Sequence, residues 1–414
     1  MTEMETGRVS ADKTLNILGI RGLPAAHGGF ETFAAKLAPY LRDRGWTVNV
    51  YCQVDDGSAP AVAPYHEDDW EGIHRIHIGV KRGGPVGTIE FDWKCTRDVL
   101  KRPGIDLVLG YNTAIFTILQ RLKGRRVVMN MDGIEWKRAK WSLPAKAWFF
   151  INEIVGAHVC STPIADHPEI AAHLRRIGCR RSVVIPYGAD EVTDGNAELL
   201  VPYGLSPNEY FVSIARIEPE NSILEIVRAF SKTARGMKLA VLGNMDPNNP
   251  YHRAVRKAGS PEVVFLGAIY DKATVEALRV FCRAYLHGHQ VGGTNPSLVE
   301  ALGCGCAVIA HDNRFNRWVA GDGQVFFSDV QSCEEAIGLA CQNNNLEHSR
   351  IFARDQHKAN FQWLDVLTTY ADTFLRQETL EAPPPAKWLA PDPLQKHIED
   401  GTSSQSTSGE EMKQ

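Results

Sequence analysis

Short apolar segments alternate with helical patterns along the chain, and this alternation occurs twice. In the first half, Phe30, Phe33, Leu37 and Leu41 recur at helical spacing and predict a helix. Buried strands of the same half are predicted at residues 15–20, 47–51, 106–109, 126–129 and 183–185. Short buried strands separated by helices indicate a parallel sheet covered on both faces.

The second half repeats this scheme. Strands are predicted at residues 210–214, 238–242, 263–266, 284–286, 307–309 and 325–327. Two capping boxes, Ser222 with Glu225 and Ser332 with Glu335, predict the starts of helices. The pattern as a whole predicts an α/β protein with two doubly wound, Rossmann-like domains.

The boundary between the two domains is predicted between Pro186 and Pro207, where Gly, Asp, Asn and Pro accumulate. The last residues are rich in Pro and then in Ser, Thr and Glu, and they lack apolar periodicity. We therefore expect an N-terminal domain over 14–190, a C-terminal domain over 205–355, a helix over 356–380 that packs back on the N-terminal domain, and a disordered tail over 381–414.

Composition excludes several classes of protein. A net charge of -4 over 414 residues argues against a nucleic-acid binder, which needs a basic surface. No apolar run approaches the roughly 20 residues of a membrane span, and the first residues lack the apolar core of a signal peptide, so we expect a cytoplasmic protein. Nine scattered cysteines without a Cys-x-x-Cys pair predict neither disulfides nor a metal site.

Ligands of doubly wound folds bind beyond the carboxyl ends of the strands, and three loops stand at such ends. The first contains Gly28 and Gly29, followed by Glu31, where a helix begins. Its free N–H groups suit an anion. An ordinary strand-to-helix turn explains the same residues, because Gly19 and Gly22 do not complete a dinucleotide-binding fingerprint.

The second loop carries Arg216 directly after a strand. A guanidinium group has a permanent charge and a bidentate donor fork, which suits a diphosphate. A surface salt bridge with Glu218 or Glu220 explains the arginine equally well.

The third loop runs from His287 to Glu300, and its glycines precede a helix start at Asn295 and Pro296. The Gly-Gly-Thr sequence exposes backbone N–H groups to an anion. His287 and His289 have the spacing of metal ligands, but no third ligand is evident, which favours a hydrogen-bonding role.

One further segment, residues 130–138, places several polar side chains after a predicted strand. Asp132, Glu135, Trp136 and Arg138 are expected to lie over the cleft. An Asp before Gly is also typical of a simple turn.

Five segments together, residues 18–33, 130–138, 185–189, 216–221 and 292–300, resemble the retaining family-4 glycosyltransferases of the GT-B fold. They are most similar to the rhamnosyltransferase-type subgroup of bacterial polysaccharide synthesis. The resemblance extends from about Leu15 to Leu375. It implies two Rossmann-like domains facing across a cleft and sugar transfer with retention, without a metal or cofactor. The implied donor is a nucleotide-sugar, dTDP-rhamnose first, and the implied acceptor is a glycan or lipid-linked sugar.

The resemblance also implies roles for residues. Arg216 would hold the donor diphosphate, Glu300 would bond the ribose, and Asp132 stands where most relatives place a histidine near the donor sugar; these three are the expected catalytic residues. The expected donor-binding residues are Gly28, Gly29, Asn221, Gly267, Ile269, Tyr270, His287, Gly292, Gly293, Thr294, Asn295, Pro296, Ser297 and Leu298. The expected acceptor-side residues are Glu31, Glu135, Trp136 and Arg138.

Two positions depart from the broad family pattern. Asn221 replaces a lysine, and Gly292 replaces the first glutamate of the sugar-binding loop. The subgroup shows both changes, which remove a cation from the diphosphate site and a carboxylate from the sugar site. An altered sugar pocket for a 6-deoxysugar fits these changes.

Three other functions compete with this reading. A UDP-hexose-dependent glycosyltransferase would share the fold, and so would an inactive scaffold of a polysaccharide assembly complex. The loop 292–300 argues against a UDP-sugar 2-epimerase.

Lipid-linked acceptors would bring the protein to the inner face of the cytoplasmic membrane, through a surface over 123–150. Its residues are Lys123, Arg125, Arg126, Lys137, Arg138, Lys140 and Lys146 with Trp136, Trp141, Trp148 and Phe149, although core tryptophans beside a solvated basic face explain them equally well.

Overall fold

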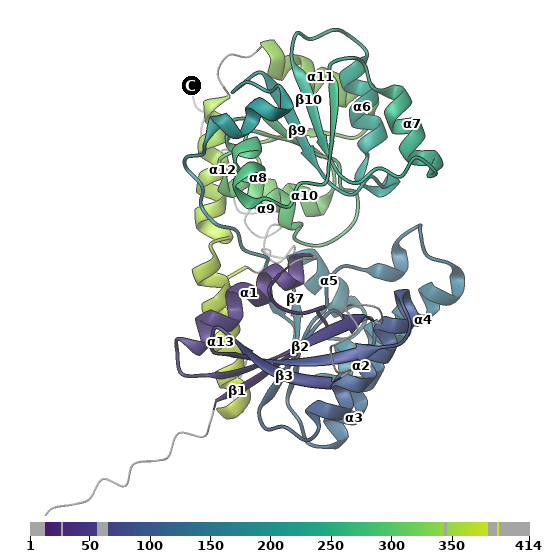
Figure 1. Cartoon of the computed structure of the whole chain (residues 1–414), viewed down its shortest axis with the longest axis vertical. Helices are drawn as coiled ribbons and strands as arrows, with labels where there is room; N and C mark the ends of the chain where they lie inside the picture. The colour runs from purple at the N-terminus through teal and green to yellow at the C-terminus, as the bar shows by residue number, and fades with distance from the viewer. Residues whose placement is uncertain (1–12, 26–27, 56–64, 343–345, 380–386, 389–414) are drawn as a thin grey trace, which may run out of the picture.

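The computed structural model describes residues 13–25, 28–55, 65–342, 346–379 and 387–388. Two α/β domains lie one above the other along the long axis of the molecule (Figure 1). Each domain has its own sheet and apolar core, which confirms the predicted fold class of two doubly wound, Rossmann-like domains.

The N-terminal domain has an eight-stranded sheet of order β3-β4-β2-β1-β5-β6-β7-β8. Every neighbouring pair is parallel except β3 with β4. The strands are β1 (Thr14–Leu18), β2 (Thr47–Asp55), β3 (Tyr65–Trp70), β4 (Ile73–Val80), β5 (Ile105–Leu109), β6 (Val127–Asn130), β7 (Thr162–Ala165) and β8 (Val183–Val184).

Helices cover this sheet because each carries an apolar stripe at helical spacing. In α1, the stripe is Phe33, Leu37 and Leu41, all of which are buried. The helices are α1 (Gly29–Arg42), α2 (Gly84–Val99), η1 (Ala114–Phe116), α3 (Thr117–Leu122), η2 (Glu135–Lys137), α4 (Leu143–Val159) and α5 (Pro168–Arg176).

The C-terminal domain has an all-parallel sheet of order β11-β10-β9-β12-β13-β14. Its strands are β9 (Tyr210–Ile214), β10 (Lys238–Leu242), β11 (Val263–Gly267), β12 (Ala284–His287), β13 (Val308–His311) and β14 (Val325–Phe327). Its helices are η3 (Ala197–Tyr203), η4 (Pro219–Asn221), α6 (Ile223–Ser231), α7 (Pro250–Ala258), α8 (Lys272–Val280), α9 (Pro296–Gly303), α10 (Arg314–Ala320) and α11 (Val330–Gln342).

The chain then returns to the N-terminal domain. Helix α12 (Glu347–Asn360) contacts α9 and α10, whereas α13 (Trp363–Thr379) packs against α1 (Figure 1). Tyr370 and Phe374 of α13 are buried in the N-terminal core, and the ring centroids of Phe33 and Tyr370 are 4.6 Å apart. Apart from residues 387–388, the predicted disordered tail lies outside the described residues.

Three strands were not predicted, namely β3, β4 and β7. The sequence of β3, Tyr65–Trp70, is polar between its first and last residues, because β3 is an edge strand that only one neighbour covers. Strand β7 has four residues and contains Pro163, so its local pattern is too short to distinguish from a loop.

The helix start predicted at Ser222 is correct, since α6 begins at Ile223, but neither predicted capping box forms. Ser222 has a φ of 50° and makes no side-chain cap to α6; its hydroxyl accepts a hydrogen bond from Gln290 Nε2 at 2.9 Å instead. Helix α11 begins at Val330, before Ser332, and the backbone N–H of Ser332 donates to the Asp329 carboxylate at 2.8 Å. In both cases another side chain provided a competing hydrogen bond that the local pattern does not contain.

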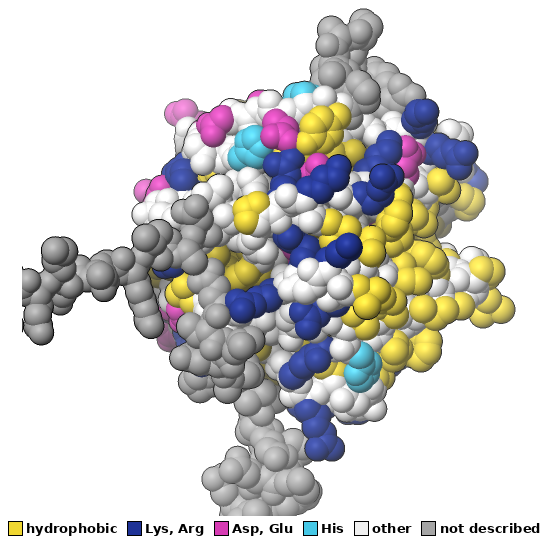
Figure 2. All heavy atoms as spheres, turned by 90° about the horizontal axis from the view of Figure 1, so that it is seen from below, with side chains coloured by type: hydrophobic (Ala, Val, Ile, Leu, Met, Phe, Trp, Pro, Cys, Tyr) yellow, Lys and Arg dark blue, Asp and Glu magenta, His cyan; other side chains and the backbone are white. Residues whose placement is uncertain are grey.

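Apolar side chains gather along one side of the N-terminal domain, beside a band of Lys and Arg (Figure 2). The exposed large apolar residues of the neighbouring elements η1, α3 and α4 are Ile115, Ile118, Leu122, Leu143, Phe150 and Ile151. Among the described helices, none is both long and apolar enough to cross a membrane.

Candidate active site between the two domains

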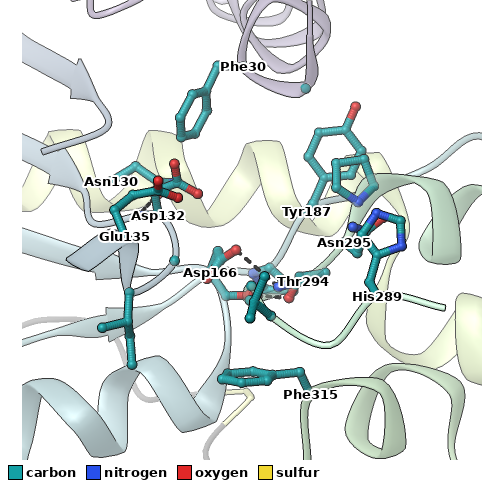
Figure 3. Close-up of a pocket in the computed structure, with 18 of the residues that line it drawn as sticks. Phe30, Asn130, Asp132, Glu135, Asp166, Tyr187, His289, Thr294, Asn295 and Phe315 are labelled. Atoms are coloured by element: carbon teal, nitrogen blue, oxygen red, sulfur yellow. Dashed lines mark hydrogen bonds between the residues drawn. The ribbon is translucent and has the colours of Figure 1, made fainter. Parts of the chain in front are cut away.

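A cavity of about 410 Å³ lies between the two domains and is lined by both. Figure 3 shows side chains from the N-terminal domain and from the loop before α9 pointing toward one another across it. A volume of this size falls in the range of small-molecule sites.

Two helix N-termini meet at this cavity. Gly29 opens α1 and Pro296 opens α9, and a Cβ atom at Gly29 would lie 3.1 Å from Pro296 Cγ. Asn295 caps α9 by accepting a hydrogen bond from the Ser297 N–H at 3.0 Å, as its position in the sequence predicts. Because the free N–H groups of a helix start carry partial positive charge, the meeting point favours an anion.

Arg216 lines the cavity, and its side chain is 67% exposed. The sequence left a salt bridge with Glu218 as the alternative role, and one guanidinium nitrogen does lie 3.5 Å from the Glu218 carboxylate. Asn221 is buried and holds the loop by donating from Nδ2 to the Arg216 carbonyl at 2.8 Å. Arg216 therefore retains a charged group that faces the cavity, on a backbone that Asn221 fixes.

Arg138 connects the two domains. Its guanidinium pairs with Glu135 at 2.7 Å and with Glu220 of the C-terminal domain. A third carboxylate, that of Glu218, lies 3.8 Å from Arg138, so the Arg138 charge is neutralised within the wall of the cavity and Arg216 is the less compensated cation.

Two partly buried carboxyl groups, Asp132 and Asp166, also line the cavity. Burial raises the pKa of Asp132 to about 6, helped by the negative charge of Glu135. Burial also raises the pKa of Asp166 to about 7, helped by the charge of Asp132. Near neutral pH these groups can hold or release a proton, which is typical of functional sites.

Asp166 also joins the domains through the loop before α9. The Thr294 N–H donates to Asp166 Oδ2 at 3.0 Å, and the Thr294 hydroxyl donates to the Asp166 carbonyl. A Cβ atom at Gly293 would lie 2.1 Å from Asp166 Oδ1, so only glycine allows this approach. The glycines of this loop thus serve interdomain packing as well as the cavity.

His287 and His289 stack with ring centroids 4.4 Å apart. His289 lines the cavity, whereas His287 does not. Neither ring nitrogen of His287 has a hydrogen-bond partner among the described residues. Burial lowers the pKa of His289 to about 4 and that of His287 well below its usual value. Both rings are therefore neutral at neutral pH.

The structure brings eleven of the predicted site residues to the cavity and leaves ten outside its lining. Those that line it are Gly29, Asp132, Glu135, Arg138, Arg216, Asn221, Gly292, Gly293, Thr294, Asn295 and Pro296. Those outside it are Gly28, Glu31, Trp136, Gly267, Ile269, Tyr270, His287, Ser297, Leu298 and Glu300.

Several of the predicted residues that lie outside the lining make other contacts. Glu300 pairs with buried Arg279 at 2.6 Å, and Leu298 is fully buried in the core. The Trp136 indole donates to Glu153 at 2.9 Å. Tyr270 is 80% exposed near the carboxyl end of β11, free for a ligand to cover.

Sequence reasoning did not single out Asp166, Phe30, Tyr187 and Phe315, which also line the cavity. Tyr187 was part of a matching segment, and Phe30 was part of a helical stripe, but neither had a stated role. Asp166 follows the unpredicted strand β7 directly. A strand prediction there would have placed this carboxyl at the functional edge of the sheet.

One group of three potential metal ligands occurs among the described residues, formed by His66, Asp68 and His77 on β3 and β4. Arg75 occupies both oxygens of the Asp68 carboxylate, at 2.8 Å and 2.5 Å. A permanent cation therefore stands where a metal would need the carboxylate. This group is distant in the sheet from the cavity strands and we assign it no metal.

Comparisons with known proteins support the same fold. Residues 12–190 match a domain of unknown function, DUF1972, and residues 203–355 match the family described as glycosyl transferases group 1. A search of curated proteins found no match.

Solved structures with this fold are distant in sequence. Sucrose-phosphate synthase from Thermosynechococcus elongatus is 15% identical, with a TM-score of 0.72 over 89% of this chain and 100% of that chain. HepE from Anabaena, in complex with UDP and glucose, is 16% identical, with a TM-score of 0.66 over 88% of this chain and 99% of that chain. The fold and the family match of the C-terminal domain together support a GT-B glycosyltransferase.

Proposed function

Because the fold and the C-terminal family match support a glycosyltransferase, we propose that this chain transfers a sugar, with retention, from a nucleotide-sugar to a glycan or lipid-linked acceptor of cell-surface polysaccharide. The observation that carries the proposal is the meeting of two helix N-termini and Arg216 at one interdomain cavity. A departing nucleoside diphosphate is an anion whose charge grows during transfer, and this arrangement is built to stabilise it.

The proposed mechanism divides the work between the two walls of the cavity. When the bond between the sugar and the diphosphate breaks, its electron pair goes to the diphosphate oxygen, which Arg216 and the N–H groups before α9 stabilise. The acceptor hydroxyl forms the new bond on the same face of the sugar and gives its proton to that phosphate oxygen. Asp132 orients the sugar or the acceptor from the other wall.

The donor we propose is dTDP-rhamnose. Asn221 is buried and bonds the backbone of the Arg216 loop, so it contributes no charge to the diphosphate site. Gly292 gives the sugar end of the cavity no side chain at all, and a Cβ atom there would contact nothing within 4 Å. An open position without a carboxylate suits a 6-deoxysugar, which has no hydroxyl at carbon 6. UDP-hexose remains the second candidate, since the Anabaena structure of this fold holds UDP and glucose.

A nucleotide-sugar panel tests the proposal. The purified chain is incubated with dTDP-rhamnose, UDP-glucose and UDP-galactose, each with and without EDTA, and release of nucleotide is measured together with binding of dTDP and UDP by calorimetry. We expect release from dTDP-rhamnose that EDTA does not reduce, because Arg216 and the helix N-termini supply the positive charge. Binding without any turnover would indicate an inactive scaffold, and loss with EDTA that magnesium restores would contradict the metal-free mechanism.

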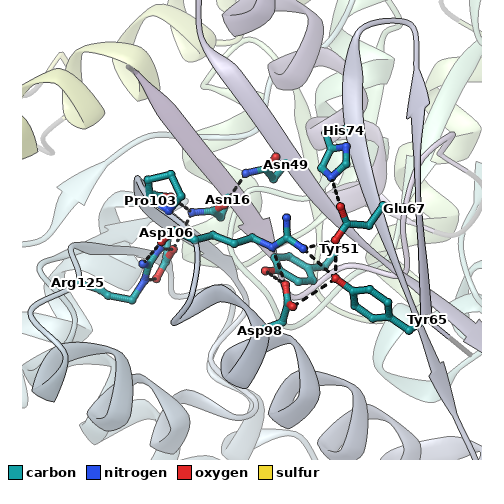
Figure 4. Close-up of polar contacts among 11 residues, drawn as sticks. Asn16, Asn49, Tyr51, Tyr65, Glu67, His74, Asp98, Pro103, Asp106 and Arg125 are labelled. Atoms are coloured by element: carbon teal, nitrogen blue, oxygen red, sulfur yellow. Dashed lines mark hydrogen bonds and ion pairs between the residues drawn. The ribbon is translucent and has the colours of Figure 1, made fainter. Parts of the chain in front are cut away.

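We also propose peripheral contact of the N-terminal domain with the inner face of the cytoplasmic membrane. The structure changes which residues can make it. Arg125 forms an ion pair at 2.6 Å with fully buried Asp106 (Figure 4), and Arg138 pairs with carboxylates inside the cleft. These two cations are therefore not part of a membrane-facing surface.

Helix α4 offers a better membrane contact. Leu143, Ala147, Phe150 and Ile151 lie at positions i, i+4, i+7 and i+8 and are all exposed, so one face of α4 is apolar. Lys146 on the same helix and Arg121 on neighbouring α3 place positive charge beside it. An apolar face beside basic side chains suits an anionic lipid surface.

A further inference from the structure

A second cavity, of about 190 Å³, lies within the N-terminal domain. It is lined by Leu18 and Gly19 at the end of β1 and by Leu109 and Gly110 at the end of β5. These strands are neighbours, but β2 lies beyond β1 on one side and β6 lies beyond β5 on the other. This is the topological switch point of the sheet, where open α/β folds bind ligands.

A partly buried carboxyl group from α2, Asp92, lines this second cavity. The Thr113 hydroxyl donates to Asp92 Oδ2 at 2.7 Å and is the one hydrogen-bond partner of this carboxyl in the described part of the chain. Burial raises the pKa of Asp92 to about 6. A desolvated carboxyl group with one partner keeps acceptor capacity that a hydroxyl-bearing ligand can use.

Hydrogen bonds fix the orientation of one polar side chain of the second cavity, that of Gln120. Gln120 lines it and donates from Nε2 to Asp106 at 2.9 Å. Asp106 is in turn bonded by Arg125 and by Asn16 Nδ2, the latter at 3.1 Å (Figure 4). Because every member of this network is engaged, the Gln120 amide cannot rotate freely, and the cavity is preorganised.

The remaining lining defines the class of ligand. Phe91 and Phe116 supply aromatic surface, and Glu31 supplies a second carboxyl group. Two carboxyl groups repel a phosphate, whereas carboxyl, amide and hydroxyl groups beside aromatic rings suit a ring that carries many hydroxyls and apolar C–H faces. The volume is less than half that of the interdomain cavity, which leaves room for one sugar ring and not for a nucleotide.

The first turn of α1 contributes to the linings of both cavities. Phe30 points into the interdomain cavity (Figure 3), and the next residue, Glu31, lines the second one. A Cβ atom at Gly110, which lines the second cavity, would lie 3.6 Å from the Phe30 ring. Phe30 therefore lies between the two cavities, and a saccharide chain bound in both would have to pass this side chain.

We propose that the second cavity binds a neutral sugar ring of the acceptor, one or more residues away from the hydroxyl that receives the transferred sugar. The inference rests on the proposed glycosyltransferase function. It assigns Asp92 as a specificity-determining residue for the acceptor and separates acceptor recognition from the donor site.

Saturation-transfer NMR with free L-rhamnose, D-glucose, D-galactose, D-mannose and N-acetyl-D-glucosamine tests the inference on the full chain, with saturating dTDP or UDP present to occupy the interdomain cavity. We expect at least one sugar to give a signal. The signal should be lost in Asp92→Ala and, by filling the cavity, in Thr88→Trp, whereas Asp372→Asn on the exposed side of α13 should keep it. Thermal unfolding of each variant verifies that it is folded.

A sugar-transfer assay provides a second test. With an accepted glycan, Asp92→Ala should raise the acceptor KM about tenfold or more, whereas the control Asp372→Asn should change neither the acceptor KM nor hydrolysis of the donor. Absence of a signal from every sugar in the unaltered chain, or an undiminished signal in both cavity variants, would overturn the inference. Nucleotide binding and donor turnover are measured on the same protein, so failure of the second cavity is distinguishable from failure of the proposed function, in which nucleotide binding or turnover would be absent.

Discussion

Across the interdomain cavity, the wall from the C-terminal domain presents the N–H groups before α9 together with Arg216, and we call it the positive wall. The wall from the N-terminal domain presents the carboxyl groups of Asp132 and Asp166 beside the start of α1, and we call it the carboxyl wall. On the first wall, Gly292 to Pro296 lead into α9 and Arg216 stands beside them. On the second wall, Asp132 and Asp166 have raised pKa values because they are desolvated. The two walls belong to domains with separate cores.

This difference shows how a two-domain protein can separate the parts of a transfer reaction. The positive wall would stabilise a leaving group that gains negative charge. The sugar and the acceptor that the carboxyl wall would orient are uncharged, so the positive wall would not repel them. A wall of carboxyl groups accepts hydrogen bonds from sugar hydroxyls and would be repelled by a diphosphate. The ion pair Arg138–Glu220 and the hydrogen bond between Asp166 and Thr294 join the two domains and fix the position of one wall relative to the other.

The largest effect is expected from removing the cation of the positive wall. Arg216→Ala should reduce turnover by about 10²–10³, equivalent to roughly 2–4 kcal/mol, because it removes a charged donor from a leaving group whose charge grows in the transition state. Arg317→Ala, which removes a half-exposed arginine from α10, is the matched control. Steady-state kinetics of both variants decides the matter. Equal activity of the two would show that Arg216 makes only its contact with Glu218.

The second expected effect is on membrane binding by the apolar face of α4 on the N-terminal domain, compared with the C-terminal domain. Leu143→Ser with Phe150→Ser and Ile151→Ser should abolish flotation with phosphatidylglycerol-rich vesicles, since each apolar side chain buried in lipid contributes about 1.5–3 kcal/mol. Leu339→Ser, an exposed leucine of α11 in the C-terminal domain, should still float. If the triple variant floats as well, or if the unaltered chain stays in solution with these vesicles, α4 is not the contact.

A smaller effect is expected from neutralising the carboxyl wall. Asp132 has a φ of 49°, and Asn adopts such a backbone as readily as Asp does, so Asp132→Asn keeps the turn. Transfer should fall roughly tenfold through loss of a charged hydrogen bond, while nucleotide affinity remains, since we propose that the diphosphate binds at the other wall. Calorimetry with dTDP and a transfer assay separate the two. A parallel loss of thermal stability and activity would reduce Asp132 to a turn residue.

The two walls also differ in how far the sequence predicts them. Glycines followed by Asn295 and Pro296 define a helix start locally, so the start of α9 was predicted from the helix-capping pattern alone, whereas the role of Arg216 came only from the family resemblance. Asp166 gains its role from Thr294, 128 residues away, and no local pattern contains that contact. Glu31 was expected on the acceptor side; it lines the second cavity and not the interdomain one, because adjacent residues of a helix point in different directions.

The smallest effect, one of stability rather than activity, comes from Asp166, which ties the carboxyl wall to the positive one. Its pKa is raised from 3.8 to about 7, so the folded state binds the proton more tightly than the unfolded state does. The stability that this proton provides is fully present below about pH 4 and is lost as the pH rises toward 7, because the folded chain must then bury a carboxylate.

Asp166→Asn should therefore be more stable than the unaltered chain at pH 8, by on the order of 1–2 kcal/mol, and should show no advantage at pH 4. The amide oxygen can still accept the Thr294 N–H, and a neutral NH₂ group replaces Oδ1, which has no partner among the described residues. Urea unfolding of both proteins at the two pH values measures the difference, with Asp372→Asn on exposed α13 as the control that should not change it. A variant that is less stable at both pH values would mean that the Asp166 charge itself attracts the loop before α9, and the two walls would then be joined by electrostatic attraction rather than by the hydrogen bond alone.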